Sequence, residues 1–187
     1  PGANLRVTPW SIAVNGVMAG CEPAHMPLLI AAAEALADER CKLASIGSSS
    51  GIFPYVLVNG PVAQQLGIAS AAQLVSRGPN PALGRAVGLI VRNIGGFVAG
   101  DTAMGTFGYI TPFVLGEDAE TCAEIGWPPF HARHGFDPDD SVITLGGTGN
   151  WGHQSTPTGT DAAMPWRSSE PAAASASGST SMIVSAG

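Results

Sequence analysis

The sequence predicts an α/β fold: a layered, mixed sheet with flanking helices. Residues 55–58 form a short β-rich run that ends in the turn-forming triplet at residues 59–61. Apolar residues in the segment 83–94 recur at spacings of three and four, which is typical of an amphipathic helix, and two glycines follow them. Strands that alternate with helices favour an α/β layer architecture.

The other predicted elements follow from local signals along the chain. Two glycines one helical turn apart, Gly84 and Gly88, predict that another backbone approaches the helix that Asn80 caps. The predictions are an extended lead-in over residues 7–17, helices over 21–38, 62–66 and 80–94, and strands over 107–115 and 141–145.

The composition indicates one domain that contacts another chain. A chain of 187 residues is long enough for one domain, and we expect a single α/β domain over residues 1–166. Charged residues make up 12% of the chain, which is a low share for a surface exposed to water on all sides. Residues 167–187 form an Ala/Ser-rich tail, and we expect a partner chain to hold it.

Several classes of partner and compartment are disfavoured. The net charge is −6 with Lys42 as the single lysine, so a nucleic-acid partner is not expected. The longest apolar run, residues 27–33, is too short to span a membrane. Three widely spaced cysteines favour reduced thiols, and hence a cytoplasmic location, over a disulfide framework.

Cys21 and His25 form the first candidate site. A thiol at the start of a helix is expected to be acidified by the helix dipole, and His25 lies one turn further on the same face. Cys21 is therefore a candidate nucleophile with His25 as its base. Alternatively, both residues bind a transition metal ion, or Cys21 is a structural thiol beside a capping histidine.

The second candidate is His131, in the run His131-Ala132-Arg133-His134. Two prolines precede this run and a glycine follows it, so we expect a loop. An imidazole titrates near neutral pH, and His131 is therefore a candidate general acid or base. The alternative is a loop held together by hydrogen bonds.

Glycine-rich turns and one helix provide candidate substrate-binding residues. Asn59 and Gly60 precede a predicted helix, where free N–H groups suit an anion or carboxylate, although ordinary helix capping is the favoured explanation. Arg85 is a candidate partner for a substrate carboxylate. The glycines at residues 146–149 lack the spacing and the lysine of a phosphate loop, so no nucleotide cofactor is expected.

Several segments together resemble a largely uncharacterised bacterial family. Its signature, Asn-x-Val-Met-Ala-Gly-Cys-x-Pro, matches residues 15–23, and weaker matches lie at residues 58–61, 83–86, 92–96 and 131–137. Such proteins resemble partners of thioredoxin-like (seleno)proteins with a Cys- or selenocysteine-Gly-Ser-Cys motif. The resemblance implies a two-component enzyme and adds weight to Cys21, His131, Asn59 and Arg85, and it brings in Asn93 as a further substrate-binding candidate.

The leading hypothesis is a subunit of a cytoplasmic enzyme that acts on a small polar or anionic substrate. Thiol-dependent reductive cleavage or lyase chemistry would take place at Cys21, with His131 as proton donor and a thioredoxin-like or second α/β chain as partner. A metal-dependent hydratase or lyase that uses Cys21 and His25 as ligands is the first alternative. A non-catalytic scaffold that docks a redox partner is the second.

Overall fold

The computed structural model confirms the α/β fold and describes residues 6–41, 43–44, 53–103, 112–148 and 182–185. Predicted features in residues 107–111 and 149–181, including most of the Ala/Ser-rich tail, lie outside the described residues. The elements are α1 (Pro9–Ala19), η1 (Pro23–His25), α2 (Met26–Ala37), η2 (Glu39–Cys41), β1 (Phe53–Asn59), α3 (Pro61–Gln65), α4 (Asn80–Asn93), β2 (Phe113–Gly116), α5 (Ala119–Glu124), α6 (Phe130–Arg133), β3 (Val142–Thr148) and β4 (Met182–Ser185).

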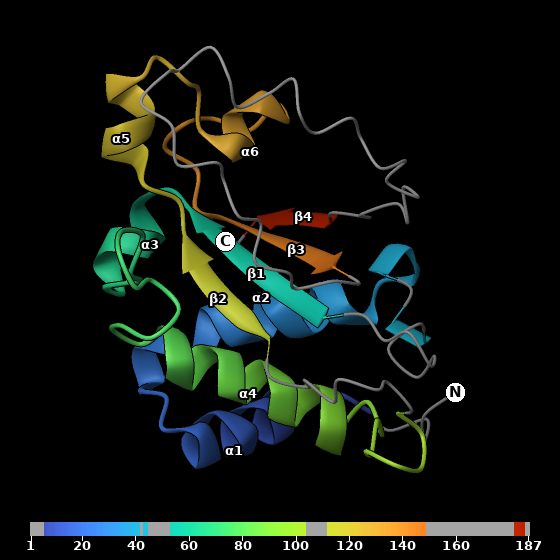
Figure 1. The fold of residues 1–187 in the computed structure, drawn as a ribbon. Helices are drawn as coiled ribbons and strands as arrows, with labels where there is room; N and C mark the ends of the chain where they lie inside the picture. Colours follow the sequence, from blue (N-terminus) through green and yellow to red (C-terminus); the bar gives the residue numbers. More distant parts are fainter. Residues whose placement is uncertain (1–5, 42, 45–52, 104–111, 149–181, 186–187) are drawn as a thin grey trace, which may run out of the picture.

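The sheet is mixed, with the strand order β2-β1-β3-β4. Strands β1 and β2 are parallel and are joined by a crossover that contains α3 and α4, whereas β3 runs antiparallel to both β1 and β4. Val58 lies opposite Gly116, so β1 and β2 end side by side at the same edge of the sheet. In Figure 1 the short helices α5 and α6 lie beyond this edge.

The hydrophobic core lies between the sheet and α2 and α4 (Figure 1). Helix α2 packs on β3 and β4, α4 packs on β2, and α1 packs across both helices as a further layer. Alternation along the strands and their register direct Val56, Val58, Ile143 and Leu145 to this core. The fully buried large apolar side chains of the core are Leu28, Leu29, Val56, Val58, Leu83, Val87, Val91, Val114 and Ile143.

Gly84 permits the close packing of α4 against the start of β2. A Cβ atom at Gly84 would lie 2.2 Å from the carbonyl oxygen of Pro112, which is closer than real Cβ atoms approach a backbone oxygen. The predicted close approach of another backbone is therefore confirmed at Gly84, and it fixes the distance between α4 and β2.

The predicted extended lead-in over residues 7–17 is wrong from Pro9 onward, because these residues belong to the helix α1, and only the residues up to the cap Thr8 are extended. Thr8 caps the helix: its hydroxyl accepts a hydrogen bond from the Ser11 N–H, and the Ser11 hydroxyl oxygen accepts one from the Thr8 N–H. Pro9 occupies the first turn, where no N–H is needed. This capping box and the burial of Ile12 and Asn15 outweigh the weak helix propensity of the valines and glycine in the segment.

Asn80 differs in role from the predicted helix cap. Helix α4 begins at Asn80, but the Asn80 side chain turns to the preceding loop. Its Oδ1 accepts from the Ala69 N–H at 2.9 Å, and its Nδ2 donates to the carbonyl oxygens of Ala69 and Leu74 at 3.0 and 2.7 Å. The buried amide therefore shapes the loop that follows α3.

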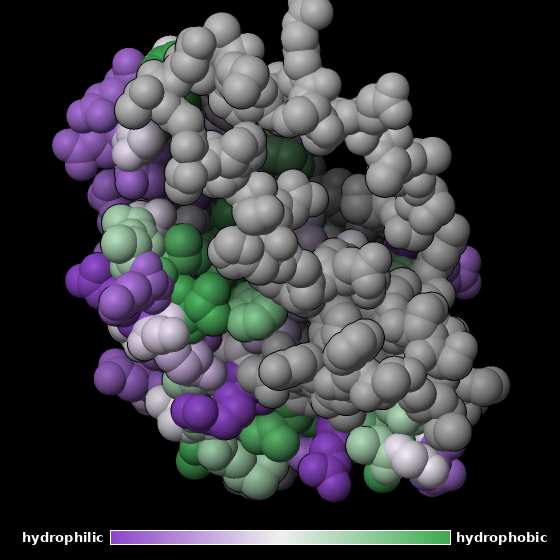
Figure 2. Space-filling view, in the orientation of Figure 1, coloured by the Kyte–Doolittle hydropathy of each residue, from purple (hydrophilic) through white to green (hydrophobic). Residues whose placement is uncertain are grey.

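None of the described helices has the combination of length and hydropathy that a membrane-spanning segment needs. In the orientation of Figure 1, Figure 2 shows hydrophilic residues gathered over α5, the helix that carries Glu120 and Glu124.

Replacement of Gly84 by Ala tests the packing of α4 on β2. We expect Gly84→Ala to lower the free energy of unfolding by about 1–3 kcal/mol, because the new methyl group overlaps the Pro112 carbonyl. The measurement is denaturant unfolding followed by circular dichroism. Arg92→Ala, an exposed change on the same helix, is the control and should stay within about 0.5 kcal/mol of the wild type; equal values for the two variants would contradict the packing argument.

Candidate functional site

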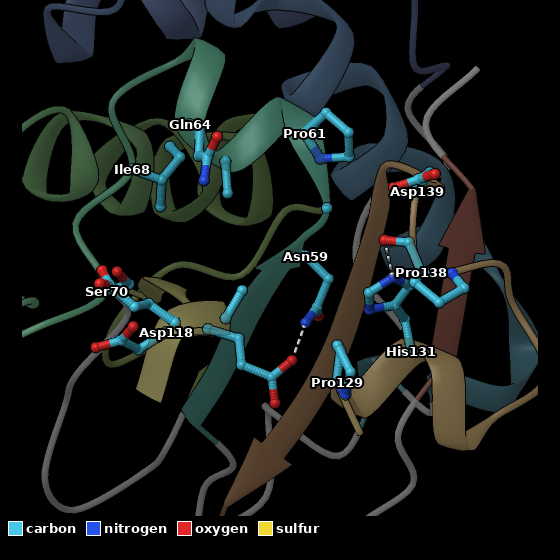
Figure 3. Close-up of a pocket in the computed structure, with 15 residues that line it drawn as sticks. Asn59, Pro61, Gln64, Ile68, Ser70, Asp118, Pro129, His131, Pro138 and Asp139 are labelled. Carbon is cyan, nitrogen blue, oxygen red and sulfur yellow. Dashed lines mark hydrogen bonds between the residues drawn. The ribbon is translucent and has the colours of Figure 1, made fainter. Parts of the chain in front are cut away.

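A pocket of about 370 Å³ opens at the edge where β1 and β2 end (Figure 3). We call it the strand-edge pocket. Ligands of open α/β sheets commonly bind beyond the carboxyl ends of parallel strands, and the position of this pocket meets that rule. The residues that line it are Asn59, Gly60, Pro61, Ala63, Gln64, Ile68, Ser70, Glu117, Asp118, Ala119, Glu120, Pro129, His131, Pro138 and Asp139.

Asn59, the last residue of β1, is 2% exposed, and a dashed line in Figure 3 marks the hydrogen bond of its amide. The Asn59 Nδ2 donates a hydrogen bond to the Glu117 carboxylate. That carboxylate also accepts from the Phe130 N–H at 2.8 Å. Burial, followed by the negative charges of Glu117 and Asp118, raises the pKa of the Cys122 thiol. The Asn59 Oδ1 is buried and has no hydrogen-bond partner within the described part of the chain.

His131 lies on α6 and is 1% exposed. The expected loop at this position is therefore wrong, since residues 130–133 form one short helical turn. The His131 Nε2 lies 3.1 Å from the carbonyl oxygen of Pro138. A carbonyl only accepts, so the Nε2 carries the proton and the neutral ring keeps a lone pair on Nδ1. This Nδ1 is buried without a partner among the described residues.

The loop that holds Pro138 packs tightly on the end of β1. Gly60 has a φ of 79°, and a Cβ at this position would lie 2.0 Å from the Asp140 carbonyl oxygen. The Ser141 hydroxyl accepts from the Val62 N–H at 3.2 Å. Gly60 was predicted to bind substrate. Its main role in the structure is to let this loop close over the strand end and bring Pro138 to His131.

Cys21 lines a different pocket, which we call the Cys21 pocket. Its volume is about 330 Å³, and it lies where α1 meets the start of α2. The thiol follows Gly20, the left-handed cap of α1, and precedes η1. The residues that line it are Ala13, Gly16, Val17, Cys21, Glu22, Pro23, Met26 and Leu29.

The expected acidification of Cys21 is not found. Burial raises the pKa of the Cys21 thiol, and the opposing effect of the positive charge of Arg85 is smaller. A buried thiolate loses hydration, and the largely apolar walls of the Cys21 pocket offer it little in return. The thiol is therefore the dominant form at neutral pH.

His25 has a capping role. The Glu22 N–H donates to the His25 Nδ1 at 3.0 Å, and the ring is 7% exposed. His25 is not among the residues described as lining the Cys21 pocket. These contacts match the alternative of a capping histidine beside a half-buried thiol, and they leave Nδ1 unable to accept a proton from Cys21.

Arg85 and Asn93, two predicted substrate-binding residues, hold α1 against α4. The Arg85 guanidinium donates to the Ala19 carbonyl oxygen from Nε and Nη2 at 3.3 and 3.1 Å. The Asn93 Nδ2 donates to the Asn15 Oδ1 at 2.7 Å. Neither residue belongs to the described lining of either pocket, so the structure brings together only Asn59, Gly60 and His131 from the predicted set.

A metal centre at Cys21 and His25 gains no support from the geometry. Within the described part of the chain, no three or more His, Cys, Asp or Glu side chains are grouped so that they could hold one metal ion. The His25 Nδ1 is also occupied by the Glu22 N–H.

Comparison of the chain with protein-family models, with curated proteins and with solved structures gave no match. The resemblance to the bacterial family therefore stays a prediction, and the functional argument rests on the geometry of the strand-edge pocket.

Glu117 is the most deeply engaged of the lining carboxylates, Glu117, Asp118, Glu120 and Asp139, none of which was among the predicted site residues. It directly follows β2, and its N–H donates to the Val58 carbonyl at 3.2 Å, which extends the pairing of the two parallel strands. A carboxylate after one strand and an amide after its parallel neighbour were the available signal. That signal requires knowledge that β1 and β2 are adjacent.

The reactivity of Cys21 tests the raised pKa. We expect iodoacetamide to react more slowly with the Cys21 thiol than with the thiol of free glutathione at pH 7.5, because the thiolate is the nucleophile and burial disfavours the thiolate form. The alkylation rate of Cys21 should still be increasing with pH at pH 9. Peptide mapping by mass spectrometry distinguishes Cys21 from Cys41 and Cys122. A rate that levels off below pH 8 would show that the thiol is acidic after all.

Proposed function

We propose that this chain is an enzyme subunit that binds a small polar molecule in the strand-edge pocket and that uses His131 as its general base. The observation that carries the proposal is that two residues of one pocket have buried acceptors, the His131 Nδ1 and the Asn59 Oδ1, without a hydrogen-bond partner among the described residues. Folded proteins leave few buried polar atoms without a partner, and such atoms in a pocket are typical of a binding or catalytic site.

The hydrogen bonds around His131 suit proton transfer. The Pro138 carbonyl fixes the tautomer and the orientation of the ring, and the lone pair of Nδ1 remains free to accept a proton. The Asn59 amide is held by Glu117 with its oxygen free. A base beside an oriented acceptor suits reactions that begin with removal of a proton from the substrate, and lyase chemistry belongs to this class.

His131→Gln tests the base while preserving the loop. The glutamine Nε2 occupies nearly the position of the imidazole Nε2 and can still donate to Pro138, but Gln offers no basic nitrogen in place of Nδ1. We expect the variant to lose about 10²–10⁴-fold in rate, the usual contribution of general-base catalysis. The assay incubates the protein with a polar metabolite extract in D₂O and follows deuterium uptake and product formation by mass spectrometry.

His134→Gln is the matched control, since His134 lies three residues further on and is exposed. It should retain wild-type rates. Conversion at the same rate by His131→Gln, or no conversion by the wild type, would overturn the proposal.

The expectation of a partner subunit is supported by the surface of α1. This helix carries no charged residue, and its large apolar side chains Trp10, Val17 and Met18 are 78%, 75% and 58% exposed. Val17 also lines the Cys21 pocket, so the apolar surface is continuous with it. Contiguous exposed apolar surface of this kind is typical of contact sites for another protein chain.

Native mass spectrometry of the protein purified from its own cells tests this expectation. We expect a species heavier than the single chain measured under denaturing conditions, and we expect Val17→Asp to shift it to the monomer, because a charge on the exposed face of α1 would be buried unpaired in the complex. An exposed-site control, Glu34→Gln on α2, should leave the assembly unchanged. A monomer for the wild type would contradict the expectation.

A further inference from the structure

Two buried atoms of the strand-edge pocket lack a hydrogen-bond partner among the described residues, and both are acceptors. The orientation of one of them, the Asn59 Oδ1, is fixed because the Nδ2 must face the Glu117 carboxylate. The His131 Nδ1 is an acceptor in the neutral ring, since the Nε2 carries the proton. A ligand that satisfies both atoms therefore has to supply hydrogen-bond donors.

The charge of the lining has one sign. Four carboxylates line the pocket, and the described residues that line it contain no lysine or arginine. Asp118 is held charged, because the N–H and hydroxyl of Thr121 donate to its carboxylate and lower its pKa. The net charge of −6 adds to the attraction for a positive ligand. The four carboxylates belong to Glu117, Asp118, Glu120 and Asp139.

The chemistry of the walls narrows the kind of cation. Quaternary ammonium groups have no N–H donor and are usually bound by cages of aromatic rings. Among the described residues of the lining there is no Phe, Tyr or Trp. The buried acceptors and the polar walls instead suit a primary ammonium or guanidinium group, whose N–H donors point in several directions.

We infer that the ligand of the strand-edge pocket is a small organic cation with N–H donors, such as a primary amine or a guanidine compound, which donates to Asn59 and His131 and is attracted by Glu117 and the outer carboxylates. This inference rests on the proposed function and names its substrate class. The sequence predicted a polar or anionic substrate. The inference keeps the polar substrate and gives it a positive charge in place of a negative one. The volume of about 370 Å³ accommodates a molecule of metabolite size.

Three probes of equal chain length and different charge test the inference. They are putrescine, 1,4-butanediol and succinate, titrated into the full chain at low salt while NMR follows the side-chain amide of Asn59 and the ring of His131. We expect saturable shifts of both signals with putrescine, at least tenfold weaker binding of butanediol and no shift with succinate. Added salt should weaken putrescine binding.

Two variants separate the roles of charge and fold. Asp118→Asn combined with Asp139→Asn removes two outer charges, and Asn still caps α5, so we expect at least a threefold loss of putrescine affinity and an unchanged affinity for butanediol. Glu34→Gln, a loss of charge on the exposed face of α2, is the control and should not change either affinity.

Succinate or butanediol that binds at Asn59 and His131 as tightly as putrescine would overturn the cationic class and leave the pocket as the proposed site. The absence of a shift with all three probes would also overturn the inference that the pocket binds a small organic cation. The loss of activity in His131→Gln is a separate measurement, so a failure of the ligand class and a failure of the proposed base can be told apart.

Discussion

The carboxylate of Glu117 is the interaction on which the strand-edge pocket depends. It follows β2 and accepts hydrogen bonds from the Asn59 side chain and the Phe130 N–H. One charged group thus connects the end of β1 with the start of α6. Hydrogen bonds to an ionised acceptor are stronger than neutral ones, and two donors on one carboxylate reduce the cost of removing it from water. Loss of this charge would remove the interaction that orients the Asn59 amide and one of the contacts that hold α6.

The pocket is costly to build, which supports a functional origin. A buried acceptor without a partner costs about 1–3 kcal/mol, and Asn59 and His131 each leave one in this pocket. Thr144, in the middle of β3, has the third such atom among the described residues, and it is not part of the lining. The core itself is apolar and closely packed, so its side chains incur no comparable cost. Two of the three such atoms therefore belong to one pocket, where a ligand with hydrogen-bond donors would offset their cost.

The sequence was informative where the determinants are local. The run at residues 55–58 and the periodicity after Asn80 identified β1 and α4, because period-2 and period-3.6 patterns depend only on neighbours in the chain. It failed for α1, where the Thr8 and Ser11 capping box and packing on α4 overcome poor propensity. At the site, Asn59 and His131 were recognisable as polar residues beside turn signals. Glu117 was not, because its role depends on the adjacency of two strands separated by the whole α3–α4 crossover.

The position of Cys21 shows why proximity to a helix start is a weak argument for an acidic thiol. Helix dipoles act through unpaired N–H groups of the first turn. Here the turn after Cys21 begins with Pro23, which has no N–H, and the Glu22 N–H is already taken by the His25 Nδ1. The remaining positive influence is Arg85, whose guanidinium is engaged by the Ala19 carbonyl. Desolvation therefore determines the pKa of this thiol. In the strand-edge pocket the carbonyl oxygen of Pro138 orients the ring of His131. The buried Nδ1 of that ring has no hydrogen-bond partner among the described residues, and the proposal that it acts as a base rests on this geometry and not on a helix dipole.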